Sequence, residues 1–128
     1  MGLDNGIIVK KAELTKKLFK VKKNCLFEYN GSFEIAYWRK CWNVRNDIFT
    51  ITEGWENDQS YTSLDRDDIY NIIKLLKSYN KKTWDSSNSI WDWKEHKTAN
   101  KRNIKHLKFL YKIMKQYPEI EVYFYDSY

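Results

Sequence analysis

The chain has 128 residues, a net charge of +6 and aromatic side chains at 17% of its positions. This length suits one domain of ordinary size, and so high an aromatic content excludes an intrinsically disordered chain. No apolar run is long enough to cross a bilayer, and the first residues lack the apolar core of a secretory signal. We therefore expect a single domain over residues 1–128, located in the cytoplasm and without membrane contact.

The basic charge favours anionic partners, but lysine supplies most of it. Of the 23 basic residues, 19 are lysine and four are arginine. Side chains that read base edges or clamp phosphates in two-point contacts are preferentially arginine. Sequence-specific recognition of nucleic acid is therefore not expected, whereas a nucleotide or a non-specific nucleic acid stays a candidate partner.

The search for catalytic and metal-binding patterns predicts neither a cofactor nor a metal site. Two cysteines and two histidines stand at scattered positions, which is no ligand pattern. Cys41 falls on a predicted helix stripe and is expected to be a buried thiol. His106 lies beside a lysine-rich face and is expected to be solvated. Since no phosphate loop or nucleophile motif is present either, the sequence favours a binding protein and not an enzyme.

The first third of the chain predicts strands around a tight hairpin. Residues 3–9 end in an apolar run that predicts an opening strand, and the lysine-rich residues 10–23 predict a loop or a single helical turn. Asn30 and Gly31 separate two apolar segments, which predicts a hairpin with a type I′ turn. In that register Glu28 lies opposite Phe33.

From residue 37 onward the sequence pattern predicts mainly helices. Residues 37–52 predict a helix, because apolar and aromatic positions recur on one face. Residues 53–64 predict a loop with a short strand near Tyr61. A second helix is predicted to follow, capped by Thr62 or Ser63 and burying Ile69, Ile72, Ile73, Leu76 and Tyr79. The third is predicted over residues 98–117, and the strict alternation of residues 119–125 predicts a closing strand.

These elements predict an α+β domain with a small mixed or antiparallel sheet of three to four strands and about three helices packed on one face. Whether the first strand pairs with the last stays open on the sequence alone.

Residues 34–46 carry the strongest binding signal, because aromatic and cationic side chains alternate there. Arginine stacked on an aromatic ring makes a platform that suits a nucleotide base with its phosphate. The alternative is an internal cation–π pair with Arg45 buried against Glu34 or another acid. The predicted ligand-binding residues are Tyr37, Trp38, Arg39, Lys40 and Arg45.

Further candidates come from other segments. The second-choice binding residues are Asp4, Asn5, Trp91, Trp93 and Tyr123. The tryptophans of residues 84–93 either cap the core or face a partner. A comb of cations over residues 94–115 is either a solvated face or an anion-attracting surface: Lys94, Lys97, Lys101, Arg102, Lys105, Lys108, Lys112 and Lys115. The excess of aromatic residues also leaves a homo-oligomer open.

Four stretches of the chain together resemble a family of small uncharacterised proteins of phages and prophages of low-GC Gram-positive bacteria. They are MGLDNGI at residues 1–7, YWRKCW at 37–42 with Arg45 and Asn46, SIWDW at 89–93, and EVYFYDSY at 121–128. The lysine-rich residues 10–23 have no counterpart in that resemblance.

The resemblance implies a role by analogy, since small phage proteins without catalytic motifs often antagonise host defence. The expected function is a phage-derived binding protein that blocks a bacterial defence system, either by sequestering a nucleotide signal or by occluding a host defence protein. The alternative is a non-specific nucleic-acid-binding accessory protein.

Overall fold

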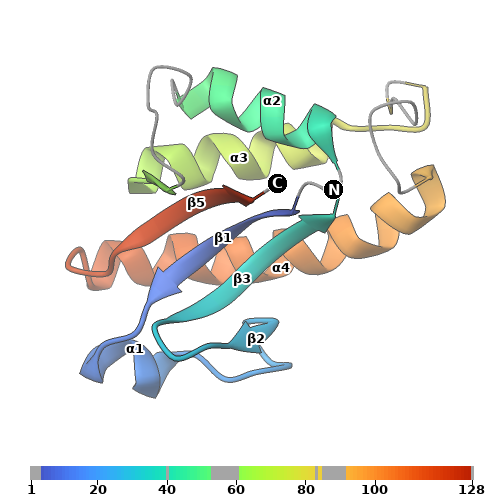
Figure 1. Ribbon diagram of the computed structural model, residues 1–128. Helices are drawn as coiled ribbons and strands as arrows, with labels where there is room; N and C mark the ends of the chain where they lie inside the picture. The colour runs from blue at the N-terminus through green and yellow to red at the C-terminus, as the bar shows by residue number, and fades with distance from the viewer. Residues whose placement is uncertain (1–3, 40, 53–60, 83, 85–91, 128) are drawn as a thin grey trace.

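The computed structural model describes residues 4–39, 41–52, 61–82, 84 and 92–127. They form a five-stranded sheet in the order β2-β3-β1-β5-β4 with four helices (Figure 1). The strands are β1 Asp4–Lys10, β2 Phe27–Glu28, β3 Ser32–Arg39, β4 Tyr61–Ser63 and β5 Val122–Ser127, and the helices are α1 Glu13–Leu18, α2 Trp42–Thr52, α3 Arg66–Ser78 and α4 Trp93–Gln116. The predicted α+β class is confirmed, with one strand more than expected.

Strand β1 is the centre of the sheet and pairs antiparallel with β3 on one side and β5 on the other. The pairing of the first strand with the last, open on the sequence, is therefore present. Ile7 lies opposite Phe124, and Val9 opposite Val122, and all four are buried. This face of the sheet forms the core with α2, α3 and α4.

The other face of the sheet is open. Gly6 lies opposite Tyr37 on β3 and opposite Tyr125 on β5, so the three residues share this face. Figure 1 views the molecule from the open side, with α4 crossing behind the strands. The helices that build the core thus lie on one side of the sheet, as predicted.

The β2–β3 hairpin has the predicted register but not the predicted turn. Glu28 lies opposite Phe33, and the Tyr29 N–H donates to the Ser32 carbonyl oxygen at 2.8 Å. A type I′ turn needs positive φ at both central residues. Among the described residues only Lys22 and no glycine has positive φ, so the type I′ prediction is wrong. The register follows from the paired side chains and does not depend on that turn.

Two predicted helix boundaries are wrong, each for a physical reason. Residues 37–39 belong to β3 and not to a helix, because β1 supplies backbone partners for all three. This long-range pairing overrides a local helical period, and α2 begins only at Trp42. Helix α4 begins at Trp93 instead of residue 98, because the Asp92 side chain accepts the Glu95 N–H at 2.8 Å as its N-cap.

The lysine-rich segment forms the six-residue helix α1, which agrees with the helical alternative of the prediction and not with the loop. The Thr15 hydroxyl accepts the Ala12 N–H at 2.7 Å and donates to the Lys10 carbonyl at 3.0 Å, which fixes the start of α1. After α1, the buried Phe19 ring stacks on Phe33 with centroids 5.6 Å apart. The apolar residues of this segment therefore close one end of the core.

The N-cap of α3 is Asp65 and neither of the predicted residues, which lie in β4 or at its end. The Asp65 carboxylate accepts the Asp68 N–H at 2.8 Å, and the Asp68 carboxylate accepts the Asp65 N–H at 3.0 Å.

Asp65→Ala is expected to lower the free energy of unfolding by about 1 kcal/mol, because it removes this N-cap. Ser63→Ala removes an exposed hydroxyl and should change it little. Urea denaturation checks both, and equal losses would contradict the cap assignment.

Candidate anion-binding site

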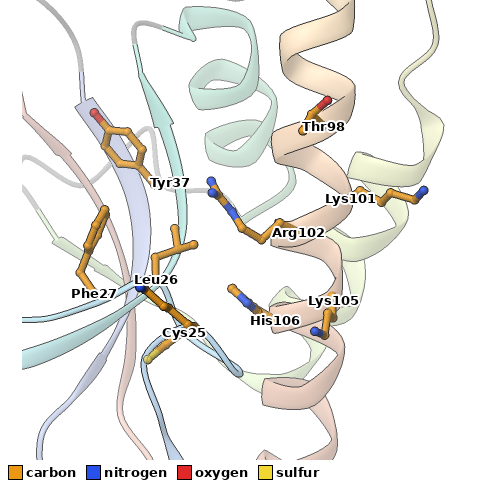
Figure 2. A pocket seen from close by; sticks show the side chains of 10 residues that line it. Cys25, Leu26, Phe27, Tyr37, Thr98, Lys101, Arg102, Lys105 and His106 are labelled. Carbon is orange, nitrogen blue, oxygen red and sulfur yellow. The ribbon is translucent and has the colours of Figure 1, made fainter.

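A cavity of about 740 Å³ opens between α4 and the β2–β3 hairpin (Figure 2). It exists because β2 has only two residues, which leaves the rest of the outer β3 edge without a paired strand. Side chains of α4 contact the backbone of β3 there instead of a paired strand. The Asn103 side-chain amide donates to the Tyr37 carbonyl oxygen at 3.2 Å, and His106 Nδ1 lies 3.0 Å from the Ile35 carbonyl oxygen. The cavity thus lies where β2 ends and α4 reaches the strand.

Four cations line this cavity: Lys22, Lys101, Arg102 and Lys105. Its described lining residues include no carboxylate. The ion pairs found between described residues are elsewhere, and none involves these four side chains. In Figure 2 Arg102 reaches from α4 toward the strands, whereas Lys101 points to the other side of the helix. Cations without counter-ions in a hollow raise the local concentration of anions.

Three of the cations come from consecutive turns of α4. Thr98, Lys101, Arg102 and Lys105 follow the spacing i, i+3, i+4, i+7, which makes them neighbours on the helix surface. They belong to the comb that the sequence left open as a solvated face or an anion-attracting surface. That pattern contains three of the cavity's cations but did not predict the cavity, because the opposite wall comes from a distant loop.

Lys22 stands on the opposite wall with a φ of 71°. The left-handed conformation costs a non-glycine residue about 1 kcal/mol. The loop holds it through Asn24, whose side chain accepts the Lys20 N–H at 2.8 Å and donates to the Leu18 carbonyl at 2.9 Å. Strain of this kind gathers at functional sites. Nothing in the sequence pattern distinguished Lys22 from neighbouring lysines.

An apolar and aromatic wall completes the cavity through Leu26, Phe27 and Tyr37. The Phe27 side chain is 51% exposed, and its ring centroid lies 6.3 Å from that of Tyr29. An exposed ring beside cations can stack on a flat heteroaromatic group.

His106 is buried, so the prediction of a solvated side chain is wrong. Burial lowers its pKa, and the positive charges of Arg102 and Lys105 lower it further, against the opposing effect of the bond to Ile35. The ring is therefore neutral at pH 7. Since a carbonyl oxygen only accepts, Nδ1 carries the proton. The other ring nitrogen, Nε2, is then an acceptor in the cavity wall.

The residues predicted to form an aromatic-cation platform in residues 34–46 do not come together in the structure. Trp38 is fully buried in the core, and Lys40 lies outside the described residues. Arg39 is exposed at the end of β3. Arg45 pairs with Asp126 at 2.8 Å and lies over the Phe49 ring at 4.6 Å, which is the structural alternative with a different acid. Of the four first-choice residues that the structure describes, Tyr37 lines the cavity and the other three do not.

The described second-choice residues also lie apart from the cavity: Asp4, Asn5, Trp93 and Tyr123. Asp4 accepts the Tyr37 hydroxyl at 2.6 Å on the open face. Asn5 is buried, and its amide lies 3.4 Å from the Cys41 carbonyl oxygen. The Tyr123 hydroxyl donates to Glu121 at 2.8 Å.

The tryptophans that follow α3 show the core-capping alternative. Trp84 is buried and stacks on His96 with ring centroids 3.6 Å apart. Trp93 lies 5.7 Å from the same His96 ring. Burial lowers the pKa of His96 to about 4. Trp91 lies outside the described residues. Cys41 is a buried thiol, as predicted.

A buried acid lies at the centre of the open sheet face. Glu34 is 1% exposed, and its Oε1 accepts the Tyr125 hydroxyl at 2.7 Å, while its Oε2 has no hydrogen-bond partner. Burial raises the pKa of Glu34 to about 7, and the charge of Asp4 adds to this effect. Strand alternation alone places Glu34 in solvent, and the alternative that buried it did so against Arg45, which instead pairs with Asp126.

The described residues hold no group of three potential metal ligands. No described helix combines the length and the apolar character that a membrane span requires. Comparisons with protein-family models, with curated proteins and with solved structures find no match to this chain.

Proposed function

We propose that this chain is a binding protein for a nucleotide, held in the cavity between α4 and the hairpin. The observation that carries the proposal is the uncompensated basic lining beside an aromatic wall. A volume of about 740 Å³ suits a ligand of nucleotide size, since small-molecule pockets span roughly 300–1,000 Å³.

The cavity offers complementary groups to both ends of a nucleotide. The planar fork of Arg102 can hold a phosphate with two hydrogen bonds, and Lys101 and Lys105 add point charges at its rim. Phe27 can stack on the base. The acceptor Nε2 of His106 suits an N–H donor on the edge of the base.

The biological role in this proposal is sequestration of a nucleotide signal, which agrees with the role implied by the phage resemblance. A protein that binds such a signal tightly removes it from the host defence system that responds to it. Occlusion of a defence protein is the other form of antagonism and does not need the cavity, so ligand binding separates the two.

Arg102→Ala is expected to weaken nucleotide binding about tenfold, because a charge-assisted hydrogen bond contributes about 1.5–3 kcal/mol. The measurement is isothermal titration calorimetry with nucleoside mono-, di- and triphosphates at two salt concentrations. Lys112→Ala is the matched control, because Lys112 is an exposed cation of the same helix that does not line the cavity. An unchanged affinity in a folded Arg102→Ala protein would contradict the assignment.

The wild-type protein tests the proposal as a whole. A ligand present at 100 times its dissociation constant stabilises the folded state by about 2.7 kcal/mol. At least one nucleotide of the panel should therefore raise the melting temperature by several degrees. If none does, the proposed function fails, and a host protein becomes the partner to capture.

A further inference from the structure

A second cavity adjoins the first along α4. It has a volume of about 390 Å³ and is lined by Lys101, Ile104, Lys105 and Lys108. Lys101 and Lys105 line both cavities. Figure 2 shows why Lys101 can do so, since its side chain leaves the helix on the side away from the strands. The basic surface therefore continues beyond the nucleotide cavity.

At the far end of this surface, α3 contributes another cation. Helix α3 packs against α4, and its Lys77 side chain lies near enough to the exposed Lys108 to lower the pKa of Lys108 through the interaction of the two amino groups. Neither lysine takes part in an ion pair between described residues. Two neighbouring ammonium groups repel each other, and an anion placed between them relieves the repulsion.

The cations thus form a path with an aromatic wall at one end. The path runs from Arg102 past Lys105 to Lys108 and Lys77. Because an α-helix rises 1.5 Å per residue, Arg102 and Lys108 stand roughly 9 Å apart along α4. Arg102 reaches toward the strands in the first cavity, whereas Lys108 lines the second cavity, so each end of the path offers its own phosphate position. A ligand that uses the whole path must carry phosphates at successive positions.

We propose that the ligand is a single-stranded oligonucleotide whose terminal base enters the cavity while its following phosphates run along α4 to Lys108 and Lys77. The inference rests on the proposed function of that cavity. A positively charged groove that follows the backbone, joined to an aromatic ring that stacks a base, is how proteins bind unpaired strands. A duplex is excluded as the ligand, because its paired bases cannot enter a cavity.

The test compares two probes that share a base, thymidine monophosphate and a fluorescein-labelled dT6 strand, by calorimetry and anisotropy over a range of salt concentrations. The Lys77→Ala/Lys108→Ala variant is expected to bind dT6 about tenfold more weakly, with a salt slope smaller by about 1.4, since each lost contact to a single strand removes about 0.7. Its affinity for the monophosphate should not change. Lys16→Ala/Lys17→Ala is the matched control, because it removes the same charge at two exposed lysines of α1 that line neither cavity.

Three other results would overturn either the oligonucleotide proposal or the proposed function. If Arg102→Ala weakens both probes but Lys77→Ala/Lys108→Ala weakens neither, the cavity binds a mononucleotide and the path is overturned. If the control variant weakens dT6 as much as the test variant, the effect is one of net charge and the path is again overturned. If the wild-type protein binds neither probe nor any nucleotide of the panel, the proposed function itself fails. Thermal unfolding verifies that each variant is folded.

Discussion

Gly6→Ala is expected to lower the free energy of unfolding by about 3 kcal/mol, because the central strand has no room for a side chain there. An added Cβ would lie 2.6 Å from the Ala36 carbonyl oxygen, 2.6 Å from Glu34 Oε1 and 3.0 Å from a Tyr125 ring carbon. The carbonyl belongs to the paired strand β3 and cannot move without breaking the β1–β3 pairing. Glu34 is buried beneath Tyr125 and has little space either.

Gly31→Ala is the matched control for that substitution. A Cβ on Gly31 meets no atom within 4 Å, and Gly31 does not have positive φ. Reduced freedom of the unfolded chain then stabilises the protein by up to about 1 kcal/mol. Urea denaturation of both variants gives the comparison. A loss at Gly31 as large as that at Gly6 would show that the close approach of Glu34 and Tyr125 is not the cause.

Glu34→Gln is expected to make the protein more stable above neutral pH. Glu34 has a pKa of about 7 when folded, against 4.5 for the free side chain. Between these values the folded state holds more protons than the unfolded state, so stability falls as pH rises. At pH 8 the buried charge costs roughly 3 kcal/mol, since each pKa unit corresponds to about 1.4 kcal/mol. Glutamine cannot ionise and still offers an oxygen to the Tyr125 hydroxyl.

The measurement is the free energy of unfolding of both proteins from pH 4 to pH 8. The two should be about equally stable at pH 4, and Glu34→Gln should exceed the wild type by roughly 2–3 kcal/mol at pH 8. Glu121→Gln is the control, because Glu121 also accepts a tyrosine hydroxyl but is exposed. A difference between wild type and Glu34→Gln that does not depend on pH would contradict a buried, neutral Glu34.

Local patterns were enough to predict those parts of the fold that local contacts decide. The hairpin register is present, and so is the buried stripe of α3 except for Tyr79, which is the half-buried C-cap of the helix. Neighbouring residues determine both features. The junction of β3 and α2 was misplaced, since residues 37–39 satisfy a helical period while their backbone pairs with β1. Which of these prevails depends on a partner some thirty residues earlier, and no local window contains that information.

In the candidate site, too, local patterns predicted some features, whereas contacts between distant segments decide the others. The comb of cations on α4 was visible as a periodicity, and three of its members line the cavity. The buried state of His106 and Glu34 was not, because each results from a contact between distant segments. His106 is covered when α4 meets the β3 edge, and Glu34 is covered when Tyr125 of β5 comes to lie over it. The sequence pattern placed His106 in solvent, and it offered Arg45 and not Tyr125 as the partner of Glu34.

The position of β1 between β3 and β5 also determines how the chain must fold. The pairing joins Asp4 to Ser127, so the two central strands come from opposite ends of the described chain. Loop closure over such a separation is costly in entropy, and folds rich in distant contacts fold slowly. The hairpin and α3 can form early, but the sheet cannot close until residues 122–127 are available. A nascent chain therefore exposes the apolar inner face of β1 and β3 until residues 122–127 have been made, and this interval is when we expect it to be most prone to aggregate.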